Sequence, residues 1–260
     1  MIKKCIQLDE VNGYYVASYP HNQLLPKLPE NREAVKKMMI SLEKKLVKNN
    51  LVEAFNKQVA EAIKTGAIHI DCMGLEGLQQ SFIPLTYSLK NDPLSTTKLR
   101  ICSNGSFKRS PGCVSYNDTL IQGPDYLNGI DGILLRWRAA SSCALADIKG
   151  CYHKIRSAKE EMSLRRLWLK PVLGLGSSEE WVVGCLGRVS FGDSLGGAVA
   201  GNAIFDVAKS CMSAKAAKCV EEDTYMDDLL LLEYFDNLCV DDLMQEVDAA
   251  LKGRDLEVKG

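Results

Sequence analysis

Apolar residues recur along the chain at two spacings, and the spacing outlines the expected elements. After Asn31 they return every three or four positions as far as Leu46, which predicts an amphipathic helix with Asn31 as its N-cap. The same pattern predicts a second helix over 51–65 that ends at Gly66. Further helices are predicted over 124–139 and 192–209, and strands over 67–70, 81–87, 99–102, 143–146, 166–169 and 181–185.

The strongest local pattern is Tyr225-Met226-Asp227-Asp228, which four leucines follow. An aromatic residue before two acids and an apolar run after them predict a tight hairpin between two buried strands, with the acids at its tip. Adjacent carboxylates repel each other, and a divalent cation bound through oxygen removes that cost. The alternative interpretation is a solvated Asp-Asp turn with no chemical role.

Two other acidic positions lead to different expectations. Asp241 and Asp242 precede apolar residues spaced four apart, which predicts an amphipathic helix with one of these acids as its N-cap. Asp147 ends the predicted buried strand 143–146. A strand-end acid that faces an acidic hairpin can hold two metal ions about 3.5–4 Å apart, which is the arrangement used in phosphoryl transfer.

Composition and charge narrow the class of protein. The chain has 260 residues, of which 46% are hydrophobic and 25% charged, so it is typical of one large or two interleaved globular domains. The net charge of −1 hides an asymmetry, because residues 221–260 carry 13 acidic and 3 basic side chains. The last segment is therefore −10 and the rest is +9. This pattern suits a polyanion held near a metal site, although solvated helix faces of different sign explain it equally well.

Cysteine and histidine usage argues against two common kinds of site. The ten cysteines contain no CxxC pair and the three histidines are scattered, so neither a disulfide scaffold nor a zinc site is expected. Unpaired thiols are typical of a reducing intracellular compartment, which is cytoplasmic or nuclear. The N-terminal sequence lacks the apolar core of a signal peptide, and no apolar run reaches the length of a membrane span.

These residues resemble the reverse transcriptases, whose metal-binding hairpin reads Tyr-x-Asp-Asp. More narrowly, segments 97–101, 115–128 and 132–138 resemble the BEL/Pao class of long-terminal-repeat retrotransposons. The resemblance covers nearly the whole chain and implies an α+β right-hand polymerase with a ferredoxin-like antiparallel palm sheet backed by helices. It implies an N-terminal arm at 1–30, fingers with leading helices at 31–123, palm at 124–157, fingers at 158–187, and palm at 188–260 that stops before the thumb.

The resemblance also implies an activity and its metal ligands. The expected reaction is RNA-directed DNA synthesis, in which dNTPs are added to a primer 3′-hydroxyl on an RNA or DNA template with two Mg²⁺ ions, or Mn²⁺ in their place. Asp147 and Asp227, with the carbonyl of Ile148, would hold the metals. Asp228 would complete the acidic cluster. No membrane partner is expected, and the sequence indicates no oligomeric state.

Further roles follow from the same resemblance. Lys98 and Arg100 match fingers residues that contact the incoming triphosphate, and charge-assisted bonds to phosphate are strong. Tyr152 matches the bulky position that excludes a ribose 2′-hydroxyl. Phe191-Gly192 matches a segment that lines the nucleotide pocket, and Lys259 matches a palm lysine proposed as a general acid.

The sequence departs from the family pattern around the nucleotide pocket. Ser190 stands where the family usually has proline, Leu195-Gly196-Gly197 replaces a Ser-Pro pair, and Asn104-Gly105 replaces an Asp-Ala pair. The thumb and ribonuclease H segments are also expected to be missing. An inactive retroelement-derived fragment that binds nucleic acid or a partner without polymerising is therefore the alternative. An RNA-directed RNA polymerase shares the acids, but Tyr152 and the Tyr-x-Asp-Asp form argue against it.

Overall fold

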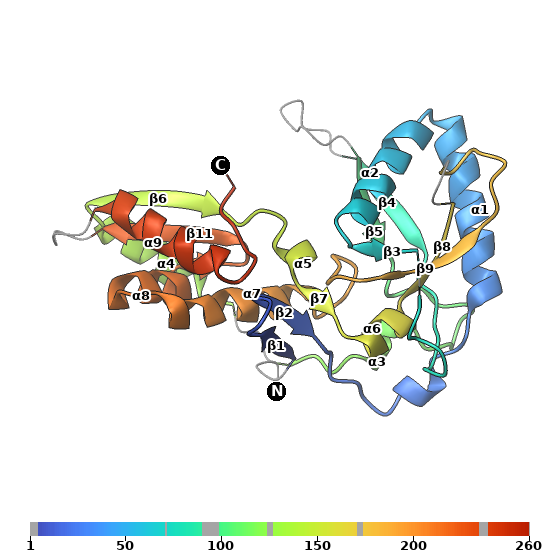
Figure 1. Ribbon diagram of the computed structural model, residues 1–260, viewed down its shortest axis with the longest axis horizontal. Helices are drawn as coiled ribbons and strands as arrows, with labels where there is room; N and C mark the ends of the chain where they lie inside the picture. Colours follow the sequence, from blue (N-terminus) through green and yellow to red (C-terminus); the bar gives the residue numbers. More distant parts are fainter. Residues whose placement is uncertain are drawn as a thin grey trace. The chain divides into compact units, whose positions relative to one another are not determined.

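The computed structural model describes residues 5–70, 72–89, 99–123, 127–170, 174–233 and 239–259. The fold is mixed α+β with small antiparallel sheets (Figure 1). Two compact units alternate along the chain: the first contains 1–17, 123–156 and 197–260, and the second contains 18–122 and 157–196.

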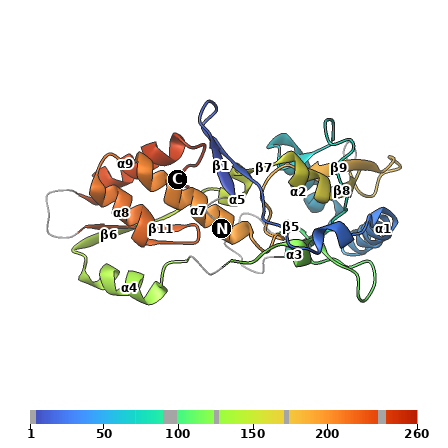
Figure 2. The same cartoon turned by 90° about the horizontal axis from the view of Figure 1, so that it is seen from below.

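The elements of the first unit are β1 (Ile6–Asp9), β2 (Tyr14–Ala17), α4 (Ile130–Ala139), β6 (Ser142–Asp147), α5 (Cys151–Lys154), β7 (Arg156–Ser157), α7 (Gly196–Val207), α8 (Ala214–Glu222), β10 (Thr224–Tyr225), β11 (Asp228–Glu233) and α9 (Val240–Lys252). They form two antiparallel sheets, in the orders β1-β2-β7 and β10-β11-β6. Figure 2 shows α8 and α9 on one side of the β10-β11-β6 sheet and α4 on the other.

The two faces of the β10-β11-β6 sheet differ in burial. Leu229 and Leu231 of β11 are fully buried, and both α8 and α9 contact this strand. Side chains alternate along a strand, so Leu145 of β6 lies on the opposite face from its neighbour Ala146, and Leu145 is 69% exposed. The prediction of a fully buried strand over 143–146 is therefore wrong, because α8 and α9 cover one face closely, whereas the face toward α4 stays largely exposed.

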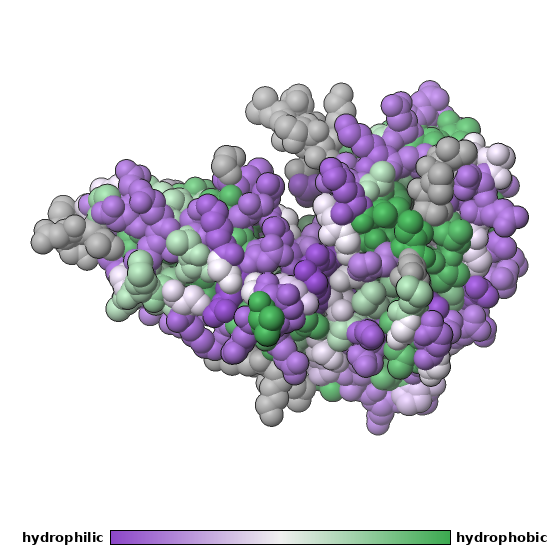
Figure 3. All heavy atoms as spheres, in the orientation of Figure 1, coloured by the Kyte–Doolittle hydropathy of each residue, from purple (hydrophilic) through white to green (hydrophobic). Residues whose placement is uncertain are grey.

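The elements of the second unit are α1 (Arg32–Lys48), α2 (Val52–Lys64), β3 (Ile68–His69), β4 (Leu85–Leu89), β5 (Leu99–Ser103), α3 (Tyr116–Thr119), α6 (Lys159–Leu164), β8 (Arg166–Leu169) and β9 (Val182–Leu186). They form a β3-β9-β8 sheet and a β4-β5 hairpin. Helix α1 packs on β8, and α2 packs on β3 and β5. Hydrophobic residues gather over β4, β5 and β9 in Figure 3. Tyr87, Ile101 and Val183 are partly buried and pack against the core of this unit.

Two predicted helix caps have other roles. Helix α1 begins where the sequence predicts, but the Asn31 side chain does not cap it. Its amide instead donates to the Phe82 carbonyl at 2.9 Å and accepts from the Phe82 N–H at 2.8 Å. Helix α9 is capped at Cys239, so Asp241 and Asp242 lie in its first turn, where negative charge favours the helix dipole. Asn31 thus occupies the predicted N-cap position without a capping hydrogen bond from its side chain, whereas the cap predicted at Asp241 or Asp242 is wrong. Both helices are confirmed.

A buried polar network joins several segments of the second unit. Arg165 is fully buried and its Nη1 lies 2.5 Å from Asp193 Oδ2, which also accepts from the Tyr19 hydroxyl at 3.1 Å. Glu161 accepts from the Tyr116 hydroxyl at 2.6 Å and faces His21 Nε2 at 2.9 Å. These contacts hold residues 188–196 in this unit.

Two absences agree with the composition. Among the described residues, no helix is long and apolar enough to span a membrane. Within the same residues the ten cysteines form no disulfide.

Candidate active site

The acidic hairpin is formed by β10 and β11. Tyr225 and Asp228 are register partners, so Met226 and Asp227 form a two-residue loop, and the predicted tight hairpin is confirmed. Met226 has a φ of +58°, which is uncommon for a residue other than glycine but is required at the first position of such loops. Asp228 is the first residue of β11 rather than part of the tip.

Asp147 and Asp228 lie directly opposite each other in neighbouring strands. The Ile148 N–H donates to the Asp227 carbonyl at 3.0 Å, which makes Asp147 and Asp228 a non-hydrogen-bonded pair. Side chains in such pairs share one face of the sheet, with Cβ atoms about 4.5–5.5 Å apart. Two carboxylates therefore face each other on the open side of the sheet, where like charges are destabilising.

The acids also affect each other and their neighbours electrostatically. Burial and the negative charges of Asp227 and Asp147 raise the pKa of Asp228. Burial and the negative charge of Asp227 raise the pKa of Tyr152. Burial, together with the negative charges of Asp227 and Asp147, raises the pKa of Cys151 to about 12. Helix α5 therefore lies close enough to the hairpin for the negative charges there to raise the pKa values of its side chains.

A short segment near the end of the chain adjoins Asp147. Val258 forms an isolated antiparallel β-bridge with Ile148, and the Lys259 N–H donates to the Asp147 carbonyl at 2.8 Å. Lys259 Nζ lies 3.3 Å from Asp147 Oδ2. Lys149 forms a second ion pair with this segment, because its ammonium lies 3.2 Å from Glu257 Oε1. A protein cation thus already neutralises part of the charge on Asp147.

The donor chemistry of this site suits a hard divalent cation. Asp147, Asp227 and Asp228 offer carboxylate oxygens, which Mg²⁺ and Mn²⁺ prefer, and their mutual repulsion favours a bound cation. Among the described residues, however, no three acidic, histidine or cysteine side chains are gathered closely enough to hold an ion. The acids are therefore neighbours in the sheet without forming a ready-made ligand cluster.

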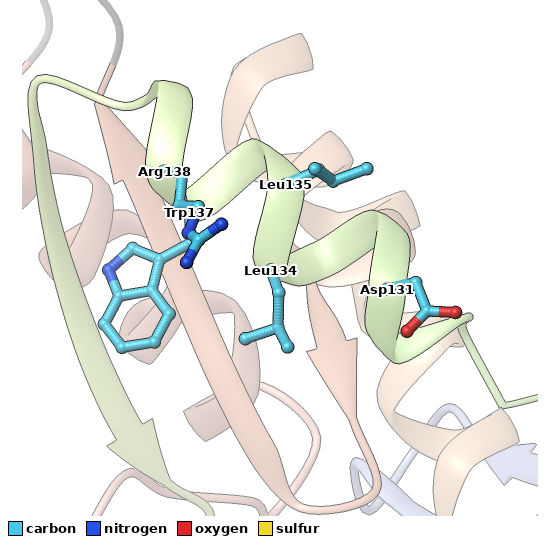
Figure 4. Close-up of a pocket in the computed structure, with 5 residues that line it drawn as sticks. All are labelled: Asp131, Leu134, Leu135, Trp137 and Arg138. Atoms are coloured by element: carbon cyan, nitrogen blue, oxygen red, sulfur yellow. The ribbon is translucent and has the colours of Figure 1, made fainter.

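Helix α4 adds apolar surface on the same side of the sheet. A cavity of about 150 Å³ separates the helix from the strands and includes Asp228 and Tyr225 in its lining, together with Leu145 and Trp137. Leu134, Leu135 and Trp137 are all at least 44% exposed. Figure 4 shows Leu134 and Trp137 projecting from one side of α4 and Leu135 from another. Asp228 of the acidic pair therefore adjoins an apolar cavity.

Tyr152 occupies the helix that follows Asp147. Helix α5 starts after Gly150, whose φ of +57° permits the sharp turn from the strand. A side chain at Gly197 would approach the Tyr152 hydroxyl to 3.2 Å, so the ring lies against the start of α7. The half-buried Tyr152 side chain thus lies between α5 and the start of α7.

Three other residues expected to contact the nucleotide, Arg100, Phe191 and Gly192, belong to the second unit. Arg100 is exposed on β5, where it pairs with Ser88 of β4. Phe191 is 55% exposed, and Gly192 follows it in a turn against the loop after β5. Lys98 lies outside the described residues.

Sequence reasoning missed the residue that supports this turn. Asn117 donates from Nδ2 to the Gly192 carbonyl at 3.0 Å, and its Oδ1 accepts from the Ser194 N–H at 3.2 Å. One local signal was available, because Ser115 and Asp118 form a capping box that starts α3. That motif predicts a short helix here but not what Asn117 contacts.

No family model matches the chain, and no curated protein matches it.

Proposed function

We propose that this chain is the fingers-and-palm part of an RNA-directed DNA polymerase, which adds dNTPs to a primer 3′-hydroxyl on a nucleic-acid template. The observation that carries the proposal is the placement of Asp147 directly opposite Asp228, beside a two-residue Tyr-x-Asp-Asp hairpin. In this proposal the first unit is the palm and the second is the fingers. The ordered resemblance of the sequence to BEL/Pao reverse transcriptases supports the same function.

Each group near the hairpin has a place in the proposed reaction. Asp147, Asp227 and Asp228, with the carbonyl of Ile148, would hold Mg²⁺ or Mn²⁺, which would stabilise negative charge on the phosphates. Tyr152 supplies bulk beside Asp227, which suits exclusion of a 2′-hydroxyl. Lys259 holds a proton 3.3 Å from Asp147, where it could serve as an acid or as a competing cation.

Primer extension by the purified full chain tests this function. We expect extension of a DNA primer on an RNA template that requires dNTPs and a divalent ion. Asp147→Asn and Asp228→Asn should each reduce the rate at least about 100-fold, because even residues that only orient metal ligands contribute 10–100-fold. Asp241→Asn with Asp242→Asn is the matched control, since it neutralises an acidic pair on α9 and should leave extension unchanged. Extension that survives the Asp147 and Asp228 changes would refute the proposal.

A second candidate is a fragment that binds nucleic acid without polymerising. The Lys259–Asp147 ion pair and the lack of a gathered ligand cluster in the described residues favour it. Binding of single-stranded RNA that weakens with salt, combined with no extension even in Mn²⁺, would support this candidate.

A further inference from the structure

Two loops of the second unit pack closely against each other. The loop after β5 contains Gly105, and the turn Ser190–Ser194 contains Gly192. A side chain at Gly192 would collide with the backbone of Ser103, and one at Gly105 would lie 2.8 Å from the Gly192 carbonyl. The Ser103 and Ser190 hydroxyls are 2.7 Å apart. Glycines at both positions therefore allow backbone to pack on backbone.

Asn117 joins these two loops through its side-chain amide. Its Nδ2 donates to the Gly192 carbonyl at 3.0 Å and to the Ser106 hydroxyl at 2.9 Å, and its Oδ1 accepts from the Ser194 N–H at 3.2 Å. A backbone carbonyl only accepts and a backbone N–H only donates, so the orientation of the amide is fixed, with Nδ2 toward the Gly192 carbonyl and Oδ1 toward the Ser194 N–H. Its own N–H donates to the Gly105 carbonyl at 2.9 Å.

The inner side of the turn is held separately. Asp193 is buried and its Oδ2 accepts from Arg165 and from the Ser190 N–H. Phe191 remains 55% exposed at the outer side. Asn117 therefore fixes the outer part of the turn, next to the residues that would meet a ligand, while Asp193 fixes its base.

We propose that Asn117 is a positioning residue for nucleoside triphosphate binding, which holds the Phe191–Gly192 turn in its binding shape before the ligand arrives. The inference rests on the proposed function, from which it takes Phe191 and Gly192 as nucleotide contacts. A turn that is already ordered loses little conformational freedom when it binds, so loss of Asn117 weakens binding. The acids of the other unit are unaffected, so the rate at saturating nucleotide is kept.

Kinetics of primer extension by Asn117→Asp test the proposal. Aspartate has the same shape but turns a donor into a second acceptor against the Gly192 carbonyl. We expect the KM for dNTP to rise about tenfold, since one net hydrogen bond is worth about that factor, with kcat within about twofold of wild type. Equal KM values, or a fall in kcat alone, would overturn the proposal.

Asn56→Asp is the matched control. Asn56 also clamps a loop of the second unit, because Nδ2 donates to the Leu175 carbonyl at 3.0 Å and Oδ1 accepts from the Leu175 N–H at 2.9 Å. Its variant should leave the KM unchanged, and an equal rise would show a general loss of rigidity. If Asn117→Asp unfolds, Ser106→Ala removes one contact only and should raise the KM about two- to threefold, and no rise would count against the proposal.

The inference and the proposed function can fail separately. If wild type extends no primer, titration with a fluorescent dATP analogue measures nucleotide binding directly. Saturable binding that Asn117→Asp weakens would support the role of Asn117 without polymerisation. No binding by wild type, or equal binding by both, would overturn it.

Discussion

Carboxylates are held in opposite ways in the two units. In the second unit, Glu161 is 1% exposed and accepts hydrogen bonds from the Tyr116 hydroxyl and the Tyr19 N–H. In the first unit, Asp147 and Asp228 face each other on an open sheet face. Buried acids with donors stabilise a fold, whereas opposed acids cost stability. The opposed pair is therefore the better candidate for function.

The surroundings of His21 extend this contrast. The Thr119 hydroxyl donates to the Tyr116 carbonyl at 2.7 Å and lies 2.9 Å from His21 Nδ1. His21 Nε2 lies 2.9 Å from Glu161 Oε1. The buried acid therefore has polar partners on the side chains around it.

The largest predicted effect comes from breaking the buried Arg165–Asp193 pair. Both side chains are 0% exposed, so Asp193→Ala leaves a buried guanidinium without its carboxylate. We expect a loss of about 3–5 kcal/mol in the free energy of unfolding, measured by urea denaturation with tryptophan fluorescence. Lys218→Met breaks an exposed pair on α8 and should cost less than about 1 kcal/mol. Similar costs for the two changes would contradict the assignment.

Stability should respond to pH in opposite directions at Glu161 and Asp228. Burial raises the pKa of Glu161, but His21, Arg165 and Tyr116 outweigh it and the net pKa is lowered. Its charge thus stabilises the fold above its ordinary pKa of 4.5, and this contribution is lost as pH falls through the lowered value. Glu161→Gln should lower the melting temperature by about 4–10 °C at about pH 7, and by less near pH 3.

Asp228 should behave in the reverse way. Its pKa is raised above 3.8, so its contribution to stability is fully present below that value and is lost as pH rises through the raised pKa. Asp228→Asn should raise the melting temperature by about 1–3 °C at about pH 7 and change little near pH 3. If Asp228→Asn instead lowered the melting temperature at about pH 7, the Asp228 carboxylate would be a group that stabilises the fold.

A smaller effect is expected at Lys259. Its ammonium competes with any metal ion for Asp147, and exposed ion pairs are worth about 0.2–1 kcal/mol. Lys259→Met should therefore strengthen Mn²⁺ binding about two- to fivefold in a calorimetric titration. Lys149→Met removes a cation that pairs with Glu257 instead and is the control. Weaker Mn²⁺ binding by Lys259→Met would mean that the lysine supports the site.

Local patterns in the sequence predict much of the fold. Spacing predicts α1 and α2 to within a residue or two, and the Tyr225–Asp228 pattern predicts the hairpin. Helix periodicity and turn chemistry are properties of neighbouring residues, so they can be read without the fold. The position of Asp147 at the end of a predicted strand, together with the resemblance to reverse transcriptases, predicts that Asp147 faces the hairpin.

Long-range contacts were the part that could not be predicted. Asn31 is a good N-cap by type, but Phe82, 51 positions later, binds its side chain instead. Asn117 meets Gly192 across 75 positions, and the Lys259–Asp147 pair spans 112. The register between β6 and β11 likewise decides which acid of the hairpin lies opposite Asp147, and that acid is Asp228 rather than Asp227. The spacing of residues along the sequence does not predict such long-range pairings.

Titration of the full chain with Mn²⁺, followed by electron paramagnetic resonance, is the decisive test of whether the opposed acids bind a metal ion. We expect saturable binding that Asp147→Asn and Asp228→Asn each weaken by at least about tenfold, while Asp241→Asn with Asp242→Asn leaves it unchanged. Binding that is the same in all of these variants, or absent from wild type, would contradict the claim that the opposed acids form a metal site.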